Sequence, residues 1–86
     1  MNSKLNAAER RHLQWVKEQP CVVCGMSAPS DAHHVKQGLH YTCIPLCKDC
    51  HQGPRNGIHG EQLMWKVMKM DELSALNKLI EQLVNK

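Results

Sequence analysis

The sequence predicts a small α+β domain held together by a zinc ion. Two C-x-x-C pairs, Cys21 with Cys24 and Cys47 with Cys50, have the form of a four-cysteine zinc site. Apolar residues recur at helical spacing near both ends of the chain, while strand-favouring and turn residues lie between the two pairs. The 86 residues contain no internal repeat or break in composition, so we expect one domain over 1–86.

The hydrophobic core that this chain offers is small. It has no Phe, two Trp and one Tyr. A domain of this length buries only about 60% of the surface of its unfolded chain. A bound metal is a common way to supply the missing stability. The fifth cysteine, Cys43, makes the count odd, which argues against a framework of disulfides alone, and we interpret it as a small buried apolar residue.

The first predicted helix covers about residues 6–18. Asn6 is a good N-cap, and Glu9 three residues later completes the capping-box pattern. Pro20 cannot continue the helix. The zinc knuckle follows at 21–25, where C-V-V-C-G forms the tight turn through which two thiolates grip one zinc ion.

Two elements are expected next, a β-hairpin over about 31–45 and a short helix over about 47–52. His33 and His34 lie on the first strand, where neighbouring side chains point to opposite faces. Gly38 suits the turn of the hairpin. Pro45 indicates that the second strand either ends there or lies at a sheet edge.

The C-terminal part of the chain predicts two helices, over about 61–69 and 71–85. Met64 and Met68 are one helical turn apart, and Asp71 is a candidate N-cap for the last helix. The last helix carries a stripe of apolar residues, which are Leu73, Leu76, Leu79, Ile80, Leu83 and Val84. We interpret the stripe as core, with the face of a homodimer as the alternative.

The cysteine pairs favour a metal site in a reducing compartment. Residues 1–15 are polar and charged, and no apolar run approaches the roughly 20 residues that span a bilayer. We therefore expect a cytoplasmic protein without membrane contacts, whose thiols are kept reduced. A thioredoxin-like redox pair is the alternative, but the chain lacks its βαβ context and the second pair would be unexplained.

Five of the six histidines lie between residues 33 and 59, a high density beside a zinc site. The order of C-V-V-C-G, A-H-H-V and P-L-C-K-D-C-H resembles the HNH (ββα-metal, His-Me finger) endonuclease superfamily over about Cys21 to His59. The double histidine is similar to that of small phage and prophage HNH nucleases associated with recombination. The resemblance implies a treble-clef-like ββα-metal unit, flanked here by an N-terminal helix and C-terminal helices.

The resemblance also implies a second, catalytic divalent metal, which is Mn²⁺, Ni²⁺, Co²⁺, Zn²⁺ or Mg²⁺. It assigns His34 to the general base, His33 to a metal ligand and His51 to the terminal histidine of the motif. His59 follows a Gly-Pro-Arg-Asn-Gly loop that can fold it back, so we expect it to be the third ligand. Imidazole ligands favour transition metals over Mg²⁺.

One position departs from the family pattern. The middle residue of the family is commonly Asn, and Thr42 stands there, so the motif is H-T-H. That residue helps to fix the loop and orient the base, a task that the hydroxyl or the backbone carbonyl of Thr42 is expected to perform. Weak or absent activity is the alternative. A second condition concerns the strand, because His33 can hold metal while His34 addresses water only if the hairpin is twisted or bulged.

The histidines also have structural alternatives. His33 and His34 would then be a structural pair, one of them completing a zinc site in place of a cysteine. His51 would face solvent or cap a helix, and His59 would be an ordinary loop residue. Two further histidines receive no functional role, namely His12 on the inner face of the first helix and His40 in the hairpin turn.

The resemblance implies hydrolysis of phosphodiester bonds in DNA, with RNA as the alternative polynucleotide. His34 would take a proton from water. Lys36, Lys48 and Arg55 flank the histidines and are candidates for phosphate contacts, although the formal charge of +3 is also ordinary for a domain without a nucleic-acid partner. A chain this short is compatible with recruitment by a partner protein.

The rival interpretation is a non-catalytic zinc-finger module that binds nucleic acid or a protein. A nuclease of the expected type needs a second metal bound by histidine, whereas the module needs only the zinc bound by cysteine. The number of metal ions per chain therefore separates the two classes.

Overall fold

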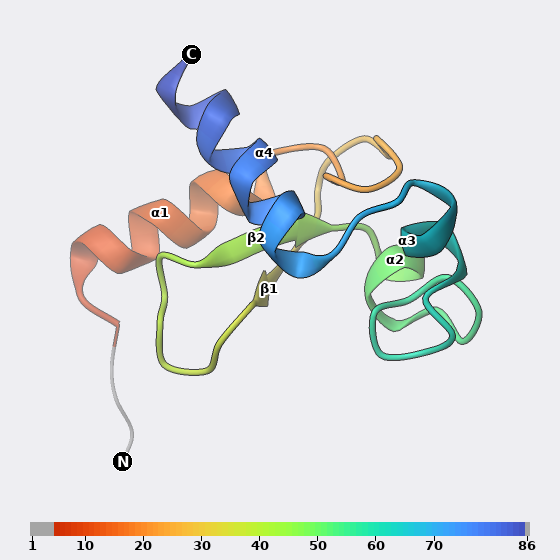
Figure 1. Ribbon diagram of the computed structural model, residues 1–86. Coiled ribbons are helices and arrows are strands. Elements are labelled where there is room, and N and C mark those ends of the chain that lie inside the picture. The colour runs from red at the N-terminus through yellow and green to blue at the C-terminus, as the bar shows by residue number, and fades with distance from the viewer. Residues whose placement is uncertain (1–4, 86) are drawn as a thin grey trace.

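The computed structural model describes residues 5–85, and in this part of the chain it forms a small α+β fold with one two-stranded sheet and four helices (Figure 1). The elements in order are α1 (Ala7–Lys17), β1 (Asp31–His34), β2 (Cys43–Leu46), α2 (Lys48–Gln52), α3 (Leu63–Val67) and α4 (Glu72–Val84). None of the described helices is both long and apolar enough to cross a membrane.

Helix α1 begins where the sequence predicts. The side-chain oxygen of Asn6 accepts a hydrogen bond from the backbone N–H of Glu9 at 2.7 Å, and the Glu9 carboxylate accepts one from the N–H of Asn6 at 2.9 Å. This capping box satisfies two backbone donors that have no partner inside the helix. Val16 is the buried residue of the helix, and it shares a core cluster with Cys43 of the hairpin.

The two strands pair antiparallel without an inserted residue. The register pairs Asp31 with Leu46, Ala32 with Pro45, His33 with Ile44 and His34 with Cys43. Pro45 lies inside β2, which is tolerated because both strands of a two-stranded sheet are edges. The second strand begins at residue 43, and residues 41 and 42 belong to the connection inside the predicted hairpin.

Alternation along β2 divides the core in two. Cys43 points to a cluster with Val16 of α1 and Leu79 of α4, which pack on one side of the hairpin (Figure 1). Ile44 lies in the other cluster. Its buried members are Cys21, Val22, Val23, Ile44, Leu46, Cys47, Cys50, Trp65 and Ala75. The larger cluster therefore contains three of the four paired cysteines.

Helix α3 is shorter than the predicted 61–69, because left-handed residues bound it on both sides. Gln62 has φ 60° and stands at the N-cap, and Lys69 has φ 56°. Neither is glycine, so the sequence carries no local signal for these conformations. The backbone N–H of Met70 closes the turn on the carbonyl of Trp65 at 2.9 Å.

Helix α4 begins at a second capping box, formed by Asp71 and Ser74. Its inner face buries Ala75 and Leu79. The expectation that the whole apolar stripe packs is wrong for three members, because α4 meets the hairpin along one side only. These three and their exposed fractions are Leu73 at 74%, Ile80 at 49% and Val84 at 74%.

Candidate metal centres

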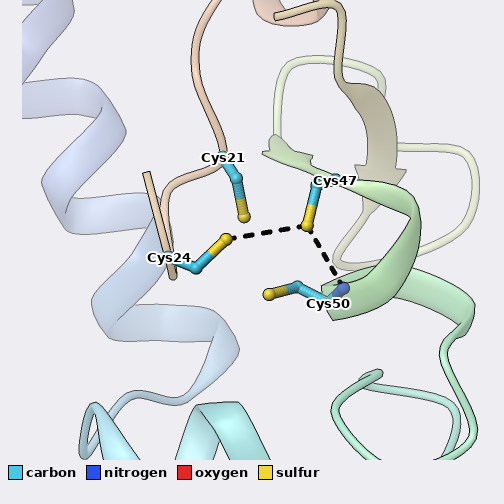
Figure 2. Close-up of side chains that lie close together, drawn as sticks. All are labelled: Cys21, Cys24, Cys47 and Cys50. Carbon is cyan, nitrogen blue, oxygen red and sulfur yellow. Dashed lines mark hydrogen bonds between the residues drawn. The ribbon is translucent and has the colours of Figure 1, made fainter. Parts of the chain in front are cut away.

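The four paired cysteines come together in one cluster (Figure 2). Their sulfur atoms all lie within 4.8 Å of one another, and the sulfur atoms of Cys24 and Cys47 are 3.7 Å apart. A tetrahedral zinc ion with Zn–S bonds of about 2.3 Å separates its sulfur ligands by about 3.8 Å. The cluster therefore fits a structural metal such as zinc.

Two local turns present these sulfur atoms. In the knuckle at residues 21–25, the N–H of Gly25 bonds to the carbonyl of Cys21 at 2.9 Å, and Gly25 has φ 82°, which favours glycine. The N–H of Val22 bonds to the carbonyl of Pro45 at 2.9 Å and docks the knuckle on β2. The second pair spans the start of α2, where Cys47 is the N-cap and Cys50 lies inside the helix.

The environment of the four thiols differs from one to the next. Cys50 is completely buried, and burial raises the pKa of its thiol. Burial also opposes ionisation of Cys21, but backbone hydrogen bonds from Cys24, Cys47 and Val23 outweigh it and lower the pKa of Cys21 to about 7. Four thiolates at this spacing repel one another, so a bound dication is what makes full ionisation favourable.

The fifth cysteine lies outside the cluster, as predicted. Cys43 is fully buried in the smaller core cluster, and its thiol donates a hydrogen bond to the carbonyl of His40 at 3.3 Å. Burial raises the pKa of Cys43 to about 11. Such a thiol stays protonated at neutral pH and behaves as a small core residue.

Three histidines form a second group that could hold a metal ion. One ring nitrogen from each of His33, His51 and His59 lies within 4.8 Å of those of the other two. The ring centroids are 5.1 to 5.3 Å apart. The three come from β1, from α2 and from the loop after α2, and they line a hollow of about 490 Å³.

The loop after α2 folds back and returns His59 to the helix. The N–H of Ile58 bonds to the carbonyl of Cys50 at 2.8 Å, and the N–H of His59 bonds to that of His51 at 3.3 Å. Gly57 makes this return feasible, because a Cβ there would lie 2.6 Å from the carbonyl oxygen of Gly53. The loop therefore requires glycine at position 57.

Sequence analysis missed Asp31, a carboxylate that holds His51. One oxygen of Asp31 lies 2.9 Å from Nδ1 of His51, and the other accepts from the ammonium of Lys48 at 2.8 Å. These hydrogen bonds from Lys48 and His51 lower the pKa of Asp31. With Nδ1 occupied, Nε2 is the nitrogen that His51 has free for a metal. Asp31 and His33 are two residues apart on one strand face, which was the available signal.

A second missed carboxylate is Glu72, the first residue of α4. Its Oε2 lies 2.7 Å from Nε2 of His33, and it lines the same hollow as the three histidines. Carboxylates commonly hold and orient metal-binding histidines in this way. The two residues are 39 positions apart, so only the packing of α4 brings them together.

His34 lies beside the three histidines and lines the same hollow, although the hairpin contains no bulge. It is the last residue of β1, and Val35 and Gln37 continue the lining beyond the strand end. Nε2 of His34 is 3.1 Å from Nδ1 of His40. Burial lowers the pKa of His34, as do the nearby charges of His40 and His33.

Thr42 performs the part of its expected task that fixes the loop after β1. Its hydroxyl donates to the carbonyl of Leu39 at 2.9 Å, and its own carbonyl accepts from the N–H of Val35 at 3.0 Å. Both groups are engaged in closing the hairpin connection. The residue that contacts His34 is His40, to which no role was assigned from the sequence.

The three basic residues proposed to contact phosphates differ in their surroundings. Lys36 and Arg55 are exposed. Lys48 is exposed over 85% of its side chain, and its ammonium is paired with Asp31. Lys48 is therefore linked to the histidine group through Asp31.

No protein-family model matches the chain, and no curated protein matches it in sequence. Family membership therefore does not decide what the two clusters do. Any assignment of function rests on the residues in and around the cysteine cluster and the histidine group.

Proposed function

We propose that the chain is a metal-dependent endonuclease of the HNH type, which hydrolyses phosphodiester bonds in DNA. The observation that carries this proposal is the grouping of His33, His51 and His59 around a hollow that His34 also lines, apart from the cysteine cluster. Structural zinc sites are closed by four protein ligands, whereas catalytic sites keep a position open. The two clusters correspond to these two kinds of site.

The order of elements supports the same assignment. Strands β1 and β2 are followed directly by α2, which is the ββα order, and the cysteine pairs lie before the hairpin and at the start of α2. This arrangement is compatible with a treble-clef-like ββα-metal unit. Three sequence motifs resemble the HNH superfamily. C-V-V-C-G forms the knuckle before β1, A-H-H-V covers the end of β1, and P-L-C-K-D-C-H covers the end of β2 and most of α2.

The proposed chemistry divides between the metal and the protein. A divalent ion held by His33, His51 and His59 would neutralise the negative charge that develops on the phosphate. His34 accepts a proton from the attacking water, and its lowered pKa keeps it neutral and able to do so near pH 7. Asp31 and Glu72 hold two of the ligand rings in place.

Substrate binding is assigned to basic side chains that flank the histidines in the sequence. Lys36, Lys48 and Arg55 would contact phosphates on either side of the bond that is cut. Such contacts position the backbone without reading its sequence, so we propose cleavage with little base specificity. A partner protein would then direct the domain to its sites on DNA.

The test is a nicking assay on supercoiled plasmid with Mn²⁺, Ni²⁺, Co²⁺, Zn²⁺ or Mg²⁺, combined with metal analysis of the purified protein. We expect the wild type to nick the plasmid and to bind two metal ions per chain. His34→Ala should abolish nicking while both metals and the helical content remain. His12→Gln, a histidine outside the hollow, is the matched control and should stay active.

Other results would redirect the assignment. A wild type that binds only one metal per chain and cuts neither plasmid nor single-stranded RNA would favour the non-catalytic zinc module. Cleavage of RNA alone would keep the enzyme class and change the substrate. Equal nicking by wild type and His34→Ala would remove His34 from the mechanism.

A further inference from the structure

The connection between β1 and β2 brings a second histidine onto His34. Nε2 of His34 and Nδ1 of His40 are 3.1 Å apart. Their rings meet edge to face, with centroids 5.2 Å apart and planes at 82°. Each atom is identified, so the contact fixes which nitrogen of each ring is engaged.

The backbone around His40 is well anchored. The thiol of the buried Cys43 donates to the carbonyl of His40 at 3.3 Å. The N–H and the hydroxyl of Thr42 both donate to the carbonyl of Leu39, at 3.2 and 2.9 Å. His40 itself is half-buried. The ring of His40 is therefore held against His34 by the residues that close the connection.

A hydrogen bond between two imidazoles needs one donor and one acceptor. If Nδ1 of His40 accepts, His34 carries its proton on Nε2 and keeps a free lone pair on Nδ1. If the roles are reversed, Nδ1 of His34 carries the proton and cannot take another. Among residues 5–85, Nδ1 of His34 has no hydrogen-bond partner, so it is available to water in the hollow.

We propose that His40 is a positioning residue. Its Nδ1 accepts a hydrogen bond from the Nε2–H of His34 and thereby keeps Nδ1 of His34 unprotonated and free to act as the base. This inference rests on the proposed nuclease function. It gives His40 the orienting task that the HNH resemblance assigns to the position of Thr42. A buried acceptor that fixes the tautomer of a catalytic histidine performs the same service in hydrolytic triads.

The proton transfer balances without any further reactant. An O–H bond of water breaks, its proton forms a new N–H bond at Nδ1 of His34, and the electron pair stays on oxygen. That oxygen forms the new bond to phosphorus while the bond from phosphorus to the leaving sugar oxygen breaks. The leaving oxygen keeps the electron pair of that bond and takes a proton from solvent water. The resulting imidazolium of His34 donates more strongly from Nε2, so the bond to His40 strengthens as charge develops.

Two substitutions at position 40 test this role. His40→Ala removes the acceptor, and we expect kcat to fall about 100-fold because the base is no longer oriented, with KM and both metals little changed. His40→Asn presents a side-chain carbonyl close to the position of Nδ1 and should recover most of the rate. A His40→Ala protein as active as the wild type, or a His40→Asn protein as slow as His40→Ala, would overturn the proposal.

A measurement independent of cleavage locates the proton directly. In ¹⁵N-labelled protein loaded with zinc, we expect the ring proton on Nε2 of His34, with a scalar coupling across the hydrogen bond to Nδ1 of His40. His40→Ala should lose this coupling. A proton on Nδ1 of His40 in an active enzyme overturns the positioning role alone. The expected proton position in a protein that cuts no nucleic acid overturns the proposed function, and the catalytic role of His40 falls with it.

Discussion

The cysteine cluster and the histidine group are neighbours with opposite constructions. The cysteines come in pairs from two local turns, and three of the four are buried in one core cluster. The histidines come from three separate segments and line an open hollow, and carboxylates hold two of their rings. A site built from local turns inside the core stabilises the fold, whereas one assembled across elements at a surface hollow leaves room for a substrate.

The histidine group also depends on the cysteine cluster more than the cysteine cluster depends on the histidine group. Cys50 and His51 are adjacent in α2, and His33 pairs with the core residue Ile44. The histidine group is therefore carried by elements that the cysteine cluster holds together. We expect loss of the cysteine site to remove both, and loss of the histidine site to leave the fold intact.

The largest effect should come from breaking the cysteine cluster. Cys50→Ser removes one sulfur ligand from the candidate zinc site. Zinc binding at a structural site contributes on the order of 10 kcal/mol to folding. We expect the variant to be unfolded, as judged by far-UV circular dichroism and zinc content. Cys43→Ala is the matched control because Cys43 lies outside the cluster, and it should fold and bind zinc. A cooperative melt of Cys50→Ser like that of the wild type would contradict the comparison.

A smaller loss of stability is expected when Trp65, the core residue that supports the cysteine cluster, is replaced. Trp65 is buried, and its indole N–H donates to the carbonyl of Cys50 at 3.0 Å. Trp65→Ala should lower the free energy of unfolding by about 3 to 5 kcal/mol in urea denaturation of the zinc-loaded protein.

Trp65→Phe separates packing from hydrogen bonding. It keeps a ring and loses the N–H, and the Cys50 carbonyl still accepts from Ile58. The cost should therefore be about 1 kcal/mol. Equal losses for the two variants would assign the effect to the hydrogen bond instead of to packing.

Replacing Asp31 should weaken metal binding at the histidine group and leave the cysteine cluster unchanged. Asp31→Ala frees Nδ1 of His51, and we expect the affinity of the second site for Ni²⁺ or Co²⁺ to fall about 10- to 100-fold. Calorimetric titration of protein already loaded with one zinc measures this affinity. Lys48→Ala leaves the Asp31–His51 bond in place and should change it less. Unchanged metal affinity in Asp31→Ala would show that this carboxylate does not hold the ligand.

The smallest effect is expected where neither site is touched. Asn6→Ala removes the capping box of α1 and should lower the free energy of unfolding by about 1 kcal/mol. Metal content and affinity at both sites should match the wild type. A change in metal binding would mean that α1 is coupled to the sites, contrary to the separation described here.

Features encoded within one turn could be predicted from the sequence. The C-x-x-C spacing defines each half of the cysteine cluster, and Asn6 with Glu9 defines the start of α1. Features that depend on packing could not. Glu72 reaches His33 only because α4 returns to the hairpin, and nothing local distinguishes His40 from an ordinary turn histidine.

The errors at the C-terminal helices have the same origin. Periodicity indicates which face of a helix is apolar but not how far another element covers it, so Leu73 and Val84 are exposed. Left-handed backbone at Gln62 and Lys69 shortens α3 at its start and at its end, and the surrounding chain imposes it, since neither residue type favours it.

Cys50 and His51 are adjacent in one five-residue helix, so the two candidate sites share α2. If zinc at the cysteine cluster holds α2 in place, a chain without zinc would not present His51, and the histidine group would form second. Under the proposed function, newly made protein would be unable to act on nucleic acid until zinc is supplied. Zinc supply would then be a maturation step for the enzyme.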